Sequence, residues 1–419
     1  MNILTVNDHY FVSGGPERYL FNVTSLLQWN QHSVIPFSVQ HKANIETPYS
    51  KYFLSPLTSG DEVYFNELKS SPRSMLKLLG RTFYSFEAKS KLRQLLRAES
   101  IDIGYLLHFL RWISPSIVDG LHERGVPVVV RVSDYGYLCP HGDFLRDRKI
   151  CELCLHGNII HSVRHKCLQG SYAVSGVNLL SEYLHRLLGV MDRIDAFVCP
   201  SRFLLSKMKE RGIAESKLHH IPTFVDSSRF LVQFDPGAYV LYFGRIAPDK
   251  GVEILIDAFS ALKKNPRHSS VQLKLAGRSN RGELDSLQHK IAAAHIDDIQ
   301  FLGELDFEAI QKLIRGCACV VVPSIWYDNM PNTILESFAS GKPVIASSIG
   351  SLPEIILNEE TGLLFEPGNA EHLADRLAYL LDNPVKILEM GRKAQHRAVT
   401  EFAPTAHYEK LIQLFRSLR

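Results

Sequence analysis

Two carboxylates, Asp328 and Glu336, stand eight positions apart in the segment WYDNMPNTILES. Asp-Asn-x-Pro-Asn is typical of a turn, and Pro331 suits the first position of a helix. Asp328 should therefore precede a helix that contains Glu336 about one turn in, where the carboxylate can accept hydrogen bonds from a pair of hydroxyls. The helix start between the acids offers amides that suit an anion. A competing interpretation makes Asp328 a helix cap and Glu336 half of an ion pair on the helix face.

Two cations occupy a second predicted strand–loop–helix segment, FGRIAPDKGVEILIDAF. Arg245 and Lys250 flank its Pro-Asp turn, at what should be the carboxyl edge of a parallel sheet. Cations placed there form a clamp for phosphate groups. A solvated loop with incidental charges is the alternative.

Two adjacent glycines follow the first predicted strand, in VNDHYFVSGGPERY. Gly14 and Gly15 let the backbone approach a ligand closely, and the helix after them offers amides to phosphate. Such a pair is also common in simple turns. The segment lacks the full G-x-G-x-x-G fingerprint, which argues against a dinucleotide dehydrogenase.

Four of the seven cysteines lie in one insert, residues 139–170. A Cys-x-x-Cys pair with two flanking cysteines can satisfy tetrahedral zinc in a closed structural site. Reduced thiols in an irregular insert are the alternative. The candidate ligands are Cys139, Cys151, Cys154 and Cys167, with His141, His156, His161 and His165 as substitutes.

The elements that must position these residues alternate between short Val/Ile/Leu strands and helices. Near-continuous apolar strands such as VPVVVRVS, YVLYFGR and CVVVPS indicate parallel sheets covered on both faces. We count two such series, joined by a linker rich in turn formers. The predicted fold class is therefore α/β, with two doubly wound domains facing a central cleft.

The predicted boundaries follow the composition. Residues 1–226 form the first domain, which contains the cysteine insert, and residues 227–400 form the second. Residues 401–419 form an amphipathic helix that can pack back across the join. The first domain also contains a basic amphipathic stretch, residues 69–97, which suggests either a membrane surface or a solvated helix face.

Bulk composition excludes several classes of protein. The net charge of +3 is too small to indicate nucleic acid as a partner. No apolar run reaches the roughly 18 residues of a membrane span. The first residues carry no basic region ahead of an apolar one, so we expect no signal peptide and a cytoplasmic protein.

The sequence resembles glycosyltransferase family 4, whose members have the GT-B fold and transfer sugars with retention of configuration. The resemblance covers nearly the whole chain. It is carried by SGGPERY, PSRFLLSKMKERGIAESKLHHIPTFVD, YFGRIAPDKGVEILIDAF, LKLAGRS, IQFLGEL and PSIWYDNMPNTILESFASGKPVIASSIGSLPEII. The family signature is Glu, seven residues, Glu. This chain keeps the second acid as Glu336 and has the shorter Asp328 at the first position.

The resemblance implies a role for each of these residues. Glu336 would bind the ribose of a nucleotide-diphosphate sugar, and Asp328 would meet hydroxyls of the transferred sugar. The diphosphate would be held by Arg245 and Lys250, the amides of Asn332 and Thr333, and Gly14 and Gly15 from the opposite domain. Glu17 would lie on the sugar and acceptor side. The family needs no metal for catalysis, so zinc would be structural only.

One departure from the family concerns the strand VVVRVSD. Relatives commonly carry His-Asp there, and this chain has Ser133 and Asp134. The lost imidazole predicts either a different donor sugar or replacement by His108 or His141. Asp134 would orient or deprotonate the acceptor hydroxyl, or it caps the loop.

Together these features predict a retaining glycosyltransferase of polysaccharide or lipopolysaccharide assembly. Its acceptor would be a saccharide or a lipid-linked saccharide, met at the inner face of the membrane if the basic stretch binds lipid. The alternatives are an epimerase or phosphorylase on the same fold, or a nucleotide-sugar-binding protein without catalysis.

Overall fold

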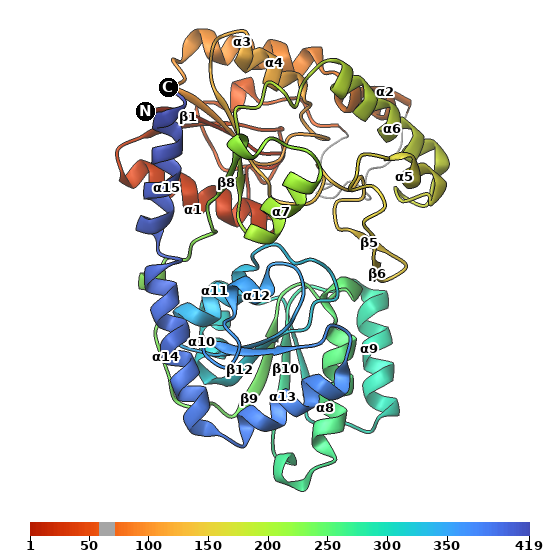
Figure 1. The fold of residues 1–419 in the computed structure, drawn as a ribbon, viewed down its shortest axis with the longest axis vertical. Helices are drawn as coiled ribbons and strands as arrows, with labels where there is room; N and C mark the ends of the chain where they lie inside the picture. The colour runs from red at the N-terminus through yellow and green to blue at the C-terminus, as the bar shows by residue number, and fades with distance from the viewer. Residues whose placement is uncertain (58–71) are drawn as a thin grey trace.

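The computed structural model describes residues 1–57 and 72–419, which form two α/β domains stacked along the long axis of the molecule (Figure 1). Each domain contains a six-stranded sheet in which every strand pair is parallel. The predicted class, two doubly wound domains, is confirmed.

The N-terminal sheet has the strand order β2-β1-β3-β4-β7-β8. Its strands are β1 (Asn2–Val6), β2 (Ser33–Phe37), β3 (Ile103–Leu106), β4 (Val128–Arg131), β7 (Ala196–Cys199) and β8 (Leu218–His220). The helices of this half are α1 (Gly15–Trp29), α2 (Pro72–Phe83), α3 (Phe86–Ala98), α4 (Ser116–His122), α5 (Ile160–Arg164), α6 (Tyr172–Leu187) and α7 (Arg202–Glu210). The cysteine insert adds a small hairpin, β5 (Leu145–Arg146) and β6 (Lys149–Ile150).

The C-terminal sheet has the strand order β11-β10-β9-β12-β13-β14. Its strands are β9 (Tyr239–Phe243), β10 (Gln272–Ala276), β11 (Ile299–Gly303), β12 (Cys317–Val322), β13 (Val344–Ser347) and β14 (Gly362–Phe365). The helices are α8 (Val252–Lys263), α9 (Arg281–Ala293), α10 (Phe307–Gly316), α11 (Asn332–Ala339), α12 (Leu352–Ile355), α13 (Ala370–Leu381) and α14 (Pro384–Thr400).

Apolar clusters cover both faces of each sheet, as parallel sheets require. In the N-terminal domain, α3, α4 and α7 pack on one face, and α1 packs on the other. In the C-terminal domain, α8 and α13 cover one face and α11 and α14 cover the other. Central strands such as β4 and β12 are buried along their whole length, which explains their unbroken runs of apolar residues.

The last helix, α15 (Pro404–Ser417), leaves the C-terminal domain and packs against α1 and β1 of the N-terminal domain (Figure 1). Pro404 stands at its start, where a missing amide hydrogen costs nothing, and it separates α15 from α14. The two segments that connect the domains contact each other: the Val225 amide donates a hydrogen bond to the Phe402 carbonyl at 2.9 Å. The predicted C-terminal helix that crosses back is thus confirmed, and it spans Pro404–Ser417.

The strand orders fix where ligands can bind. Each sheet has one point where the order reverses, between β1 and β3 in the first domain and between β9 and β12 in the second. Ligands of open parallel sheets bind outside the carboxyl ends of the strands at such switch points. Asp8 and His108 follow the first pair of strands closely, and Arg245 and Asp328 follow the second.

Candidate functional site

Contacts between loops at the strand ends join the two domains. The Asn329 side chain, after β12, donates to the carbonyls of Val132 and Ser133, after β4, at 3.3 Å each. The Glu354 carboxylate of α12 accepts from the first backbone amides of α7, where the helix dipole favours an anion. The two carboxyl edges therefore face each other, and the site lies between them.

The predicted phosphate clamp lies at the switch point of the C-terminal sheet. Lys250 contacts Asp328, with 2.6 Å between Nζ and Oδ2, and its ammonium lies over the ring of Trp326. The Ser324 hydroxyl also donates to Asp328, at 2.9 Å. Arg245 pairs with Asp249 at 2.6 Å, and more than half of its side chain is exposed to solvent. Asp328 is buried, so its charge needs the neighbouring lysine.

Glu336 forms an ion pair with the opposite domain. The Arg18 guanidinium, in the first turn of α1, contacts Glu336 with 2.7 Å between Nη1 and Oε1. Burial raises the pKa of Glu336, and the nearby Arg18 opposes that shift. The Arg18 side chain is half exposed, whereas that of Glu336 is buried.

Two helix starts meet at this point. A Cβ built on Gly15 would lie 3.8 Å from the side-chain nitrogen of Asn332, so the start of α1 lies against the start of α11. Neither helix has a side-chain cap; the cap positions are Gly14 and Pro331. Their first amides are therefore available to a ligand, and the two positive dipole ends favour an anion between them. Thr333, in the first turn of α11, donates its hydroxyl to the Phe243 carbonyl at 3.2 Å.

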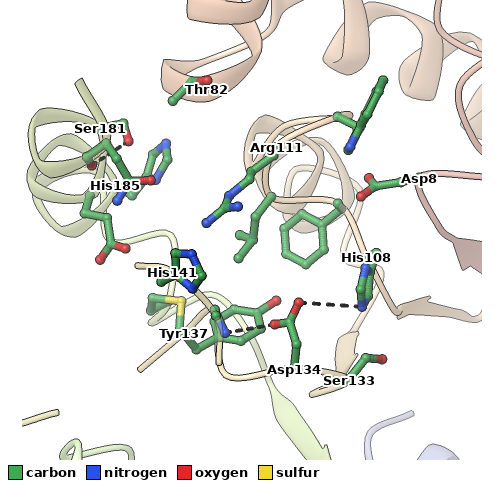
Figure 2. Close-up of a pocket in the computed structure, with 18 of the residues that line it drawn as sticks. Asp8, Thr82, His108, Arg111, Ser133, Asp134, Tyr137, His141, Ser181 and His185 are labelled. Atoms are coloured by element: carbon green, nitrogen blue, oxygen red, sulfur yellow. Dashed lines mark hydrogen bonds and ion pairs between the residues drawn. The ribbon is translucent and has the colours of Figure 1, made fainter. Parts of the chain in front are cut away.

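A cavity of about 470 Å³ opens in the N-terminal domain, beside the predicted acceptor residues (Figure 2). His108 and Asp134 lie at one end, with 3.9 Å between Nε2 and Oδ2. The other Asp134 oxygen accepts from the Gly136 amide at 2.8 Å, so this residue both caps its loop and faces the cavity. Burial raises the pKa of Asp8, which also lines the cavity, to about 7.

The residues at the departure from the family pattern have defined partners. The Ser133 hydroxyl accepts from Arg131 at 2.9 Å, so that hydroxyl is already engaged. His108 and His141 both line the cavity, and His108 lies next to Asp134. His141 pairs with Asp143 at 2.7 Å, which raises its pKa.

The Glu17 side chain forms hydrogen bonds with the glycine-rich loop that precedes it. Its two carboxylate oxygens accept from Asn7 at 3.2 Å and from Ser13 at 3.0 Å, and the residue is buried. These bonds tie the end of β1 to the start of α1, which positions Gly15 and Arg18. Glu17 therefore supports the glycine-rich loop in this structure.

The four insert cysteines lie close enough for the other three to act electrostatically on Cys154. Burial raises the pKa of Cys154 to about 12, and the other three thiols add to that shift. Across residues 1–57 and 72–419, no group of three or more His, Cys, Asp or Glu side chains is placed to hold a metal ion. The zinc site therefore stays a prediction from the spacing.

Three residues of the site were not predicted from the sequence. Arg18 reaches Glu336 from the other domain, Asn329 joins the domains, and Asp8 is a buried acid of the cavity. Their segments, SGGPERY, YDNMPN and VNDHYF, were recognised as loops after strands. The particular contacts depend on how the domains face each other, which local patterns do not show.

Two facing Rossmann-like domains with a C-terminal helix that crosses back define the GT-B class of fold. The sucrose-phosphate synthase of Thermosynechococcus elongatus superposes with a TM-score of 0.71 at 19% identity, covering 100% of this chain and 98% of that one. HepE of Anabaena, solved with UDP, has a TM-score of 0.66 at 17% identity over the full length of both chains. These TM-scores over the full length of the chain establish a shared fold.

Sequence comparison then assigns the family. The model for Glycosyltransferase Family 4 matches residues 13–229, and that for Glycosyl transferases group 1 matches residues 226–397. The chain belongs to glycosyltransferase family 4.

Among curated relatives, the D-inositol 3-phosphate glycosyltransferase of Pseudarthrobacter chlorophenolicus is 31% identical over 42% of each chain. An uncharacterized glycosyltransferase of Methanocaldococcus jannaschii is 27% identical over 54% of this chain. The matches span 59% or less of the length of these two relatives.

Proposed function

We propose that this protein is a retaining glycosyltransferase that takes a sugar from a nucleotide-diphosphate donor in the cleft and passes it to a saccharide or lipid-linked saccharide. The observation that carries the proposal is the convergence of two uncapped helix starts with Arg245, Lys250 and two buried acids. Positive groups flanked by acids suit a diphosphate with hydroxyl-bearing rings on either side. HepE of Anabaena has been solved with UDP-glucose, which supports a donor of this kind.

Each residue of the site has a separate role in this proposal. Glu336 accepts hydrogen bonds from the ribose once Arg18 releases it, and Asp328 accepts them from the transferred sugar. Breaking the glycosyl–phosphate bond leaves negative charge on the diphosphate. Lys250, Arg245 and the amides at the two helix starts would face that charge, and fixed positive groups of this kind stabilise a transition state. Retention then follows from attack on the face from which the diphosphate leaves.

The acceptor occupies the cavity of the N-terminal domain, with its reacting hydroxyl next to Asp134 and His108. Asp134 orients this hydroxyl, and His108 replaces the missing family histidine beside the sugar. A donor sugar that lacks a primary hydroxyl would equally suit Ser133, because the Ser133 side chain is held away by Arg131.

A membrane surface is the proposed place of the reaction. α2, which falls in the basic stretch 69–97, exposes Met75 and Leu76 to solvent; residues 69–71 of that stretch lie outside the described part of the chain. None of the helices in residues 1–57 and 72–419 combines the length and hydropathy of a membrane span. Contact through α2 would be peripheral, at the inner face of the membrane.

A panel of nucleotide sugars screened by thermal shift tests the donor assignment. A donor at 100 times its Kd should add about 2.7 kcal/mol to the free energy of unfolding. Glu336→Ala and Lys250→Ala should abolish that gain, whereas Glu401→Ala, at an exposed acid that pairs with Arg397, should keep it. Full donor affinity in both cleft variants would contradict the proposal.

A further inference from the structure

The cavity of the N-terminal domain extends well beyond the reacting end. Asp134 and His108 line one side, and α6 lines the opposite side with Ser181 and His185 (Figure 2). Arg111 lies between the two sides and points into the space. The cavity therefore has room for more of the acceptor than the sugar that receives the new bond.

Three arginines, Arg111, Arg186 and Arg211, line the cavity, and the charge of each acts on Glu182 of α6. Each is anchored by a backbone carbonyl of the insert: Arg111 by Pro140, Arg211 by Cys154 at 3.0 Å, and Arg186 by Gly157 at 3.5 Å. Within the described residues, none of the three has a carboxylate at ion-pair distance, which distinguishes them from cleft cations such as Lys250.

One carboxylate, Glu182, lies among the three arginines and does not balance them. Burial raises the pKa of Glu182, and the three arginines oppose that shift. The pKa of Arg211 is lowered, first by burial and then by the charge of Arg186, since like charges close together disfavour ionisation. Three cations and one half-buried acid leave an excess of positive charge around Glu182, whereas the reacting end carries the carboxylate of Asp134.

Both helices at the positive end also expose apolar side chains. α2 and α6 contact each other, and each contributes to the cavity wall, through Thr82 and through the α6 residues named above. On the same two helices, Leu76 of α2 is 72% exposed and Leu187 of α6 is 86% exposed. An acceptor that runs from Asp134 past the arginines would emerge beside this apolar surface.

We propose that the three arginines bind a phosphate or diphosphate group of the acceptor, on the far side of the sugar that carries the reacting hydroxyl. The inference rests on the proposed function, because it assigns the hydroxyl to Asp134. Guanidinium groups bind phosphate oxygens in bidentate pairs, and a partly desolvated pocket strengthens such pairs. The shared ligand chemistry is a sugar phosphate ester, whether the ester is free or linked to a lipid that lies along α2 and α6.

Calorimetric titration of the full-length protein with geranyl diphosphate, inorganic pyrophosphate and geraniol tests the proposal. Geranyl diphosphate should bind, and Arg186→Gln should weaken it about tenfold or more, the usual effect of losing one charge-assisted hydrogen bond. Arg186→Lys keeps the charge and should lose about threefold or less. Arg186 is exposed, so both variants should fold. Arg111→Gln is a second test at a residue anchored by a different carbonyl.

Comparison of the three probes separates the two sources of phosphate. Equal affinity for pyrophosphate and geranyl diphosphate supports a free phosphate ester, and tighter binding of geranyl diphosphate supports a lipid-linked one. Geraniol binding as tight as that of the diphosphates overturns the proposal, as does the absence of diphosphate binding. Binding that survives Arg186→Gln and Arg111→Gln but disappears in Lys250→Gln also overturns it, because the anion then occupies the donor cleft. Failure of the donor proposal is read separately, from the nucleotide-sugar panel.

Discussion

Lys250→Met separates the two roles that the structure gives to Lys250. In the structure its ammonium pairs with the buried carboxylate of Asp328, and in the proposed reaction it faces the leaving diphosphate. Methionine keeps the aliphatic part of the side chain and removes the charge. We therefore expect a loss of stability from the unpaired acid and a separate loss of rate from the missing cation.

The size of each loss follows from the geometry. Removing one partner of a buried ion pair costs about 3–5 kcal/mol. Lys250 is 20% exposed and Ser324 still donates to Asp328, so we expect about 2–3 kcal/mol here. For a domain of this size that lowers the melting midpoint by roughly 5–10 °C. The loss of one preorganised donor should lower kcat/KM by about a hundredfold to a thousandfold.

The double variant Lys250→Met/Asp328→Asn removes the unpaired charge. Its melting midpoint should return to within roughly 3 °C of the parent, because both partners of the pair are then neutral. Its rate of nucleoside diphosphate release should stay low, since the cation is still missing. Lys250→Arg is the matched control that keeps the charge and should keep most of the stability.

Melting curves and the release of nucleoside diphosphate from the donor identified by the panel measure the two effects. A folded Lys250→Met protein with more than a tenth of the parental kcat/KM would refute the catalytic role. A double variant that regains the parental rate would show that Lys250 acts only through the stability of the fold.

Further predictions concern the pH dependence and the insert. Arg18→Ala removes the cation that holds down the pKa of Glu336, so that pKa should rise further. The fall in kcat/KM for the donor on the acid side of the pH profile should then begin at a higher pH. If it begins at the same pH, Glu336 does not bind the donor as an anion. Asp8 holds its proton to about pH 7 when folded and to about 3.8 when unfolded. Between those two pH values, Asp8 therefore lowers the free energy of unfolding by about 1.4 kcal/mol for each pH unit of increase. The Asp8→Asn variant should become more stable than the parent as the pH rises through this window, and the difference should stay constant at higher pH. A stability difference that does not depend on pH would contradict the raised pKa. If the insert binds zinc, metal analysis of untagged protein should find about one zinc per chain and much less in Cys154→Ser, and zinc-free, stably folded protein would end that prediction.

The sequence was sufficient for the fold class because the evidence for it is local. Apolar runs bounded by turns specify buried parallel strands, and alternation with helices specifies doubly wound sheets. Because residues that follow such strands gather at one edge, Arg245, Lys250 and Asp328 could be placed together without coordinates. The start of α11 was predicted one position early, since Pro331 caps the helix and does not open it.

The contacts between domains could not be predicted in the same way. Arg18 and Glu336 are separated by 318 positions, and their meeting depends on the relative orientation of two separately folded units. The same holds for Asn329, which contacts carbonyls after β4. The arginines of the cavity come from a loop, from α6 and from the end of α7, and no spacing in the sequence relates them.

The return of α15 to the N-terminal domain constrains how the cleft can open. The polypeptide passes between the domains twice, and the two passing segments are tied together where Val225 meets Phe402. Nearby, His407 is buried against Tyr19 and the Pro222 carbonyl, which anchors the second segment to the first domain. A paired hinge of this kind resists twisting and favours a single rocking motion. Removal of residues 401–419 would leave one flexible tether, and the arginine and the acid that meet across the gap would lose their alignment.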